Sequence, residues 1–130
     1  MGGRTALHMA ASGGHAKLVG YLLKNGAAPD PRGSHNQSPL LAAAAYGHMK
    51  IVEMLANKGA DVNSKDTYSQ TPLIYSVKAG KIDAVKILLA YGAKTNEIDM
   101  NGGAALDYAN DPRIAGLLKG AGGKKANELR

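Results

Sequence analysis

The sequence has no cysteine, no phenylalanine and no tryptophan among its 130 residues. The lack of cysteine excludes disulfides, thiolate metal sites and a cysteine nucleophile. It suits the cytoplasm, which we favour, and it equally suits an exported or periplasmic protein that avoids mispaired disulfides. Six tyrosines are the only aromatic residues, so aliphatic side chains and alanine must form the core. Such a core favours thin, closely stacked helices.

The sequence also lacks any apolar run near the ~18 residues of a membrane span. Its formal charge is +6, from 16 lysines and arginines against 10 acidic residues. The cations are scattered, with one adjacent pair at Lys124-Lys125, and the tyrosines are not interleaved with them. This pattern favours a solvated basic surface over a phosphate-binding stripe, so nucleic acid is the less favoured partner.

What the sequence does contain is a 33-residue period, shown by Leu7, Leu40, Leu73 and Leu106. The same step relates glycines inside each unit and Gly-Ala pairs at its end, namely Gly14, Gly47 and Gly80, then Gly26-Ala27, Gly59-Ala60 and Gly92-Ala93. A fixed period of this length is typical of repeat proteins. We therefore predict one domain at 1–121, with repeats at 3–35, 36–68 and 69–101, a shortened unit at 102–121, and a frayed polar tail at 122–130.

Each unit is predicted to form two helices followed by an extended excursion. Ser38 and Thr71 precede prolines that suit the first turn of a helix, so they are predicted N-caps. The recurring glycines are expected to end both helices, because glycine adopts left-handed backbone angles at little cost. In the second unit, Ile51, Val52 and Leu55 form the inward stripe of the second helix.

The motifs TALHMAASGGH at 5–15, SPLLAAAAYGH at 38–48, KGADVN at 58–63 and TPLIYSVKAGK at 71–81 resemble the ankyrin repeat. The resemblance covers residues 3–121. It implies an all-α ankyrin-repeat solenoid of stacked helix-turn-helix units, with β-hairpin fingers projecting from one edge.

Both ends of the array depart from the repeat. Gly120-Ala121 comes 28 residues after Gly92-Ala93 (120 − 92 = 28), and Asp111-Pro112 starts a helix early, so the last unit is interpreted as a C-terminal cap. The first unit begins partway through its repeat at residue 3, which suggests the hypothesis that the native chain extends upstream.

No constellation in the sequence indicates catalysis, and we predict no enzyme activity, no cofactor and no metal. His8, His15 and His48 occupy recurring positions where the resemblance implies hydrogen bonds to loop backbone, and no HExxH motif is present. The resemblance also makes Asn63 and Asn96 candidates for asparaginyl hydroxylation. The favoured interpretation is that these two asparagines tie the hairpins together.

Positions that differ between repeats cluster in the fingers and on the outward side of the first helices. The resemblance implies that these regions form the concave face that grips partner proteins. The predicted partner-binding residues are Arg32, His35, Gln37, Tyr46, Lys65, Tyr68, Gln70, Lys78, Ile98 and Met100. Their basic groups could steer an acidic partner.

The resulting prediction is a non-catalytic protein-protein interaction module, monomeric in isolation. A small inhibitor or immunity protein that blocks an enzyme is the alternative, and adaptor or host-directed effector roles also remain open. The first finger is expected to differ in shape from the other two. Pro31 removes a hairpin donor there, and Gly33 replaces the aspartate found at Asp66 and Asp99.

Overall fold

The computed structural model describes residues 4–130. Within that range it contains seven α-helices, three short 3-10 helices and no strand. The α-helices are α1 Ala6–Ser12, α2 Ala16–Lys24, α3 Pro39–Ala45, α4 Met49–Asn57, α5 Pro72–Lys78, α6 Ile82–Ala90 and α7 Pro112–Gly120. The 3-10 helices are η1 Ser34–Asn36, η2 Ala105–Tyr108 and η3 Ala126–Glu128.

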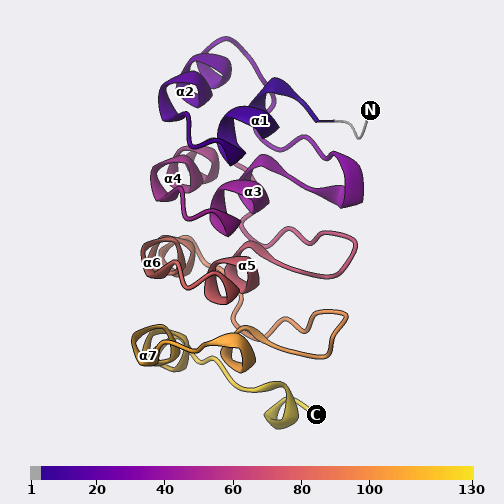
Figure 1. Cartoon of the computed structure of the whole chain (residues 1–130), viewed down its shortest axis with the longest axis vertical. Coiled ribbons are helices and arrows are strands. Elements are labelled where there is room, and N and C mark those ends of the chain that lie inside the picture. The colour runs from indigo at the N-terminus through magenta and orange to yellow at the C-terminus, as the bar shows by residue number, and fades with distance from the viewer. Residues whose placement is uncertain (1–3) are drawn as a thin grey trace.

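The helix pairs stack into a single column from the N-terminal to the C-terminal end (Figure 1). One layer, called here the first-helix layer, consists of α1, α3, α5 and η2, each in contact with the next. The second-helix layer consists of α2, α4, α6 and α7, which also contact one another in order. This arrangement confirms the predicted all-α solenoid.

Local capping explains where the first helices begin. The side-chain oxygens of Ser38 and Thr71 accept hydrogen bonds from the third helical residue, at 3.1 and 3.2 Å, which confirms both predicted N-caps. The turn that follows the first helix of the second unit contains Gly47, where φ is +74°. A non-glycine residue would be strained at that angle.

The core lies between the two layers and along the column. Ile51, Val52 and Leu55 are at most 1% exposed, so the predicted inward stripe is confirmed. Ala43 and Ala44 are completely buried, and their small size lets α3 approach its neighbours closely. Within this packing, the hydroxyl of Ser76 donates to the carbonyl of Ala44 at 3.2 Å.

The fourth unit is shorter than the others by three residues. Helix α7 begins 30 residues after α6 (112 − 82 = 30), and Gly122, at φ +87°, follows Gly92 by the same step. The predicted equivalence of Gly120 with Gly92 is therefore wrong. The missing residues come out of the first helix, which is reduced to the single turn η2. Helix α7 starts at Pro112 as expected, and the side chain of Asp111 caps it.

The C-terminal tail, expected to fray, lies against the fourth unit below η2 (Figure 1). The backbone N–H of Ala126 donates to Oδ2 of Asp107 at 2.8 Å, and Ala126 is only 7% exposed. The N–H of Lys124 donates to Oδ1 of Asn96 at 2.9 Å. These two bonds connect the tail to the repeat array.

Three fingers, at residues 29–37, 62–70 and 95–103, project from the side of the first-helix layer (Figure 1). Each is a hairpin-shaped loop with an equivalent backbone bond across its tip: Gly33 N to Gln37 O, Asp66 N to Gln70 O, and Asp99 N to Gly103 O. The other backbone bonds within the fingers join residues only three apart, as in turns, so the expected β-hairpins have no strand ladder. Neighbouring fingers are also linked, since Thr67 N donates to His35 O and Met100 N donates to Tyr68 O.

Within residues 4–130, none of the helices combines the length and the apolar character that a bilayer crossing requires.

Candidate functional site

The second and third fingers are shaped by a buried aspartate each. Oδ1 of Asp66 accepts from the N–H groups of Tyr68 and Gln70 at 2.9 and 3.0 Å. Oδ1 of Asp99 accepts in the same way from Asn101 and Gly103, both at 3.0 Å. Each carboxylate thereby holds the tip of its own finger in one conformation.

The other carboxylate oxygen joins each finger to its surroundings. Gln37 Nε2 donates to Oδ2 of Asp66 at 3.1 Å, and the hydroxyl of Tyr75 donates to the same oxygen. The third finger repeats this pattern, because Gln70 Nε2 and the Tyr108 hydroxyl donate to Oδ2 of Asp99 at 2.5 and 2.6 Å. A ladder of glutamine, aspartate and tyrosine therefore runs from finger to finger.

The ladder shifts the pKa values of its members. Burial, followed by the hydrogen bond to an aspartate, raises the pKa of Tyr75 and of Tyr108 to about 12. Burial alone would raise the pKa of Asp99. The hydrogen bonds from Tyr108, Gly103 and Gln70 outweigh it, so the pKa of Asp99 lies below its ordinary value.

Two of the predicted binding residues belong to this ladder. Gln70 is only 4% exposed, and its amide is used by Asp99, so its assignment to the binding surface is wrong. Gln37 is half-buried and donates to both Asp66 and Tyr75. Both glutamines connect neighbouring fingers, because the amide N–H₂ of each donates a hydrogen bond to the aspartate carboxylate of the next finger.

The first finger has a different shape, as expected. Glycine replaces the aspartate at position 33, and the tip forms η1 with His35 and Asn36 in the left-handed region, at φ +57° and +58°. The side chain of Asn36 donates to the carbonyl of Lys65 at 2.8 Å. The His35 ring stacks on Tyr68 with ring centroids 5.7 Å apart, so the first and second fingertips meet through their side chains.

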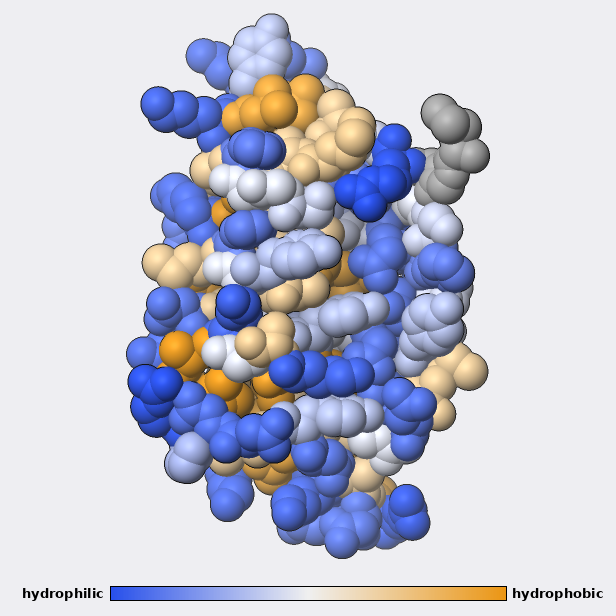
Figure 2. All heavy atoms as spheres, viewed as in Figure 1, coloured by the Kyte–Doolittle hydropathy of each residue, from blue (hydrophilic) through white to orange (hydrophobic). Residues whose placement is uncertain are grey.

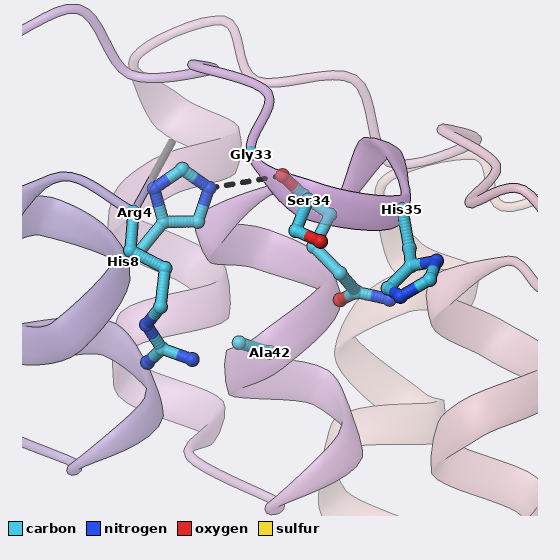
Figure 3. Close-up of a pocket in the computed structure, with 7 residues that line it drawn as sticks. Arg4, His8, Gly33, Ser34, His35 and Ala42 are labelled. Carbon is cyan, nitrogen blue, oxygen red and sulfur yellow. Dashed lines mark hydrogen bonds between the residues drawn. The ribbon is translucent and has the colours of Figure 1, made fainter. Parts of the chain in front are cut away.

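Two of the three recurring histidines and both asparagines hold backbone in place, whereas the exposed His15 makes no side-chain hydrogen bond within the described part of the chain. Nδ1 of His8 accepts from the N–H of Thr5 at 3.1 Å, so its Nε2 carries the proton and donates to the carbonyl of Gln37 at 2.9 Å (Figure 3). His48 similarly bonds to the carbonyl of Ser12. The side-chain amides of Asn63 and Asn96 each make two hydrogen bonds to the backbone turn of the following unit. In both, the amide nitrogen donates to a carbonyl and the amide oxygen accepts from an N–H group.

Several predicted binding residues are exposed apolar groups. Tyr46 at the end of α3 is 62% exposed, Tyr68 in the second finger 52%, and Met100 in the third finger 69%. Ile98, also in the third finger, is 38% exposed. Figure 2 shows mainly hydrophilic residues around them along the finger side of the molecule.

The predicted basic residues differ in how far their charges are compensated. Arg32 lies 3.2 Å from Asp30, and Lys65 lies 3.0 Å from Glu97. Lys78 places its ammonium 4.8 Å from the centre of the Tyr108 ring, which is a cation–π contact. Lys78 is thus the predicted basic residue with an exposed charge and no ion pair among residues 4–130.

Two hollows lie side by side at the junction of the first finger with the first-helix layer. One, of 190 Å³, lies between α1, the first finger and α3 (Figure 3). The other, of 290 Å³, extends toward Tyr46 and Tyr75. Both are lined by Arg4, Gln37 and Ala42, so the two hollows adjoin at these residues.

Arg4 is a residue that the sequence reasoning missed. It is exposed, and its guanidinium donates to the hydroxyl of Ser12 at 3.2 Å. A signal for it exists, because Arg4 stands one period before Gln37 and two before Gln70 (4 + 33 = 37; 37 + 33 = 70). Comparing these three positions would have identified a cation where the later repeats have an amide.

Within residues 4–130, no three histidine, aspartate or glutamate side chains are placed to share a metal ion.

Comparison with known proteins supports the repeat assignment. A family model described as ankyrin repeats in three copies matches residues 2–66, and a second ankyrin-repeat model, of many copies, matches residues 54–109. No curated protein sequence matches the chain. The two family matches together span most of the array, and the chain therefore belongs to the ankyrin-repeat family, whose repeats form a protein-protein interaction module.

Proposed function

We propose that the chain binds a partner protein across its fingers and the neighbouring first-helix layer. The observation that carries this proposal is the exposure of Tyr46, Tyr68 and Met100 on that side. Exposed tyrosines with rigid rings are frequent anchors of protein interfaces. The proposed binding set comprises Arg32, His35, Tyr46, Lys65, Tyr68, Lys78, Ile98 and Met100.

The rigidity of the fingers supports this use. Asp66 and Asp99 each accept four hydrogen bonds, and the fingers are linked tip to tip through backbone. A surface that is already ordered loses little conformational entropy when a partner binds. The mechanism is therefore complementarity to a preformed surface.

Charge favours a partner with an acidic surface. The carboxylates of Asp66 and Asp99 are buried, whereas Arg4 and Lys78 are exposed cations on the same side. Such a distribution speeds association with a negatively charged protein and makes the rate fall as salt is added.

The test is affinity capture from an extract of the native source, comparing wild type with the double variant Tyr46→Ala/Tyr68→Ala. Truncating an anchor of this kind costs about 2 kcal/mol or more, so the double variant should lose most of the recovered partner. The matched control is Tyr21→Ala, because Tyr21 is 63% exposed but lies on α2 in the other layer. Equal recovery by the double variant and wild type would reject this surface.

A further inference from the structure

The glutamine–aspartate–tyrosine ladder is interrupted at the first finger, and the interruption forms a cavity. The second finger uses Gln37, Asp66 and Tyr75, and the third uses Gln70, Asp99 and Tyr108. Each glutamine donates to an aspartate 29 positions ahead, and each tyrosine follows that aspartate by nine. Counting back by 33 from Gln37, Asp66 and Tyr75 gives the positions of Arg4, Gly33 and Ala42.

Those three residues line the 190 Å³ hollow seen in Figure 3. Gly33 and Ala42 are smaller than the aspartate and tyrosine of the later ladders, so the space that those side chains fill elsewhere is open here. At the donor position, arginine replaces a neutral amide. The hollow therefore has a cation on its wall and lacks the carboxylate that its counterparts contain.

The rest of the lining suits an anion. The remaining side chains are His8, Ser34, His35 and Gln37, and none of them is acidic. The one polar contact of the Arg4 guanidinium within residues 4–130 is with the Ser12 hydroxyl, so its remaining N–H donors are available. An arginine with free donors binds a carboxylate through two parallel hydrogen bonds.

We propose that this hollow is a subsite for an aspartate or glutamate side chain of the partner protein, whose carboxylate occupies the place of the missing ladder aspartate beside Arg4. The proposal rests on the function proposed above and adds a residue requirement to it. The partner thereby completes, at the first finger, the same polar arrangement that the chain builds for itself at the second and third.

The first experiment tests the chemistry of the hollow without any partner. The backbone of Gly33 is extended (φ −104°, ψ −154°), which an L-residue adopts readily. Gly33→Asp should raise Tm by about 4 °C, as one added charge-assisted hydrogen bond would, whereas the neutral Gly33→Asn should not. If the two variants have the same Tm, the hollow has no preference for a carboxylate and the proposal fails.

The second experiment tests recognition with a defined probe, a phage-displayed library of random peptides selected on the wild-type chain. Selected peptides should be enriched in aspartate and glutamate. One acidic peptide is then synthesised with its amide counterpart (Glu→Gln or Asp→Asn). Arg4→Gln should weaken binding of the acidic peptide about tenfold, and Gly33→Asp should do the same by filling the hollow. Neither variant should bind the amide peptide more weakly than the wild-type chain does. The control Lys86→Gln, exposed on α6, should stay within twofold.

The outcomes separate this proposal from the proposed function. Peptides that bind through Tyr46 and Tyr68 but ignore Arg4→Gln would overturn the carboxylate subsite and leave the binding surface intact. Peptides that ignore all three residues would overturn both. Selection of peptides without acidic residues would also overturn the subsite. Far-UV circular dichroism verifies that Arg4→Gln remains folded, as expected for an exposed residue ahead of the first N-cap.

Discussion

At the scale of single residues, glycines with the same backbone angle serve different purposes. Gly14 and Gly26 both lie in the left-handed region, at φ +76° and +90°. A Cβ atom on Gly14 would lie 2.7 Å from Cε1 of the His48 ring, whereas one on Gly26 would have no atom within 4 Å. Gly26 is required only for its left-handed backbone angle. Gly14 has the same requirement, and its lack of a side chain also leaves room for a histidine of the next unit.

This difference predicts unequal costs for the same substitution. Gly26→Ala should lower the free energy of unfolding by about 1 kcal/mol, the cost of a left-handed alanine. Gly14→Ala should cost about 1 kcal/mol more, because displacing the ring breaks the hydrogen bond from His48 to Ser12. Urea unfolding measures both. In a His48→Ala background the two costs should become equal, and a persistent gap would show that the ring contact is not the cause.

At the scale of elements, the stability of the fingers depends on the protonation of an aspartate at low pH and of two tyrosines at high pH. The pKa of Asp99 is lowered, so its stabilising contribution is present above the ordinary aspartate pKa and is lost as pH falls through the folded value. Tyr75 and Tyr108 have pKa values raised from 10 to about 12. Their contribution is complete below pH 10 and is lost as pH rises toward 12, because only the unfolded state ionises in that window.

The protein should therefore lose stability steeply between pH 10 and 12. Denaturant unfolding at several pH values measures this loss. The variant Tyr75→Phe/Tyr108→Phe should be less stable than wild type at neutral pH, since two hydrogen bonds to aspartate are missing, but its stability should fall less across the alkaline window. If both proteins show the same alkaline slope, the ladder tyrosines are not the groups responsible.

At the scale of the whole molecule, position in the stack decides what a repeated residue contributes. Leu18 and Ile51 occupy the same position of successive units (18 + 33 = 51), yet Leu18 is 45% exposed and Ile51 1%. The next equivalent, Ala84, is also 1% exposed. Within residues 4–130 the first unit has no preceding helix pair against it (Figure 1), so its outer face meets solvent.

A matched pair of truncations tests this dependence. Ile51→Ala should cost about 2–5 kcal/mol, because it leaves a cavity between packed helix pairs. Leu18→Ala should cost less than about 1 kcal/mol, since little buried surface is removed. Both values follow from urea unfolding curves. Comparable costs for the two variants would mean that the first unit's outer face is covered in solution.

Much of the fold is predictable because its signals are local. The N-caps at Ser38 and Thr71, the glycine turns and the inward stripe of the second helix each depend on residues within one or two helical turns. The period then places successive units in register. The different shape of the first finger was also predictable, because Pro31 and Gly33 break the pattern at positions that can be compared within the sequence.

The sequence by itself therefore determined the repeat and its helices, and the structure placed the fingers on the side of the first-helix layer. Only the tertiary structure decided which finger side chains are exposed and which are buried in hydrogen bonds to the next finger. Gln70 stands at a position that varies along the array, as a binding residue would (Arg4, Gln37, Gln70, Gly103). Its side chain is nevertheless buried, because its partner Asp99 lies 29 positions ahead on the next finger. Arg4 is exposed because the residue 29 positions ahead of it is Gly33. Pairings across such separations are set by how the repeats stack, since stacking brings distant side chains within hydrogen-bonding distance.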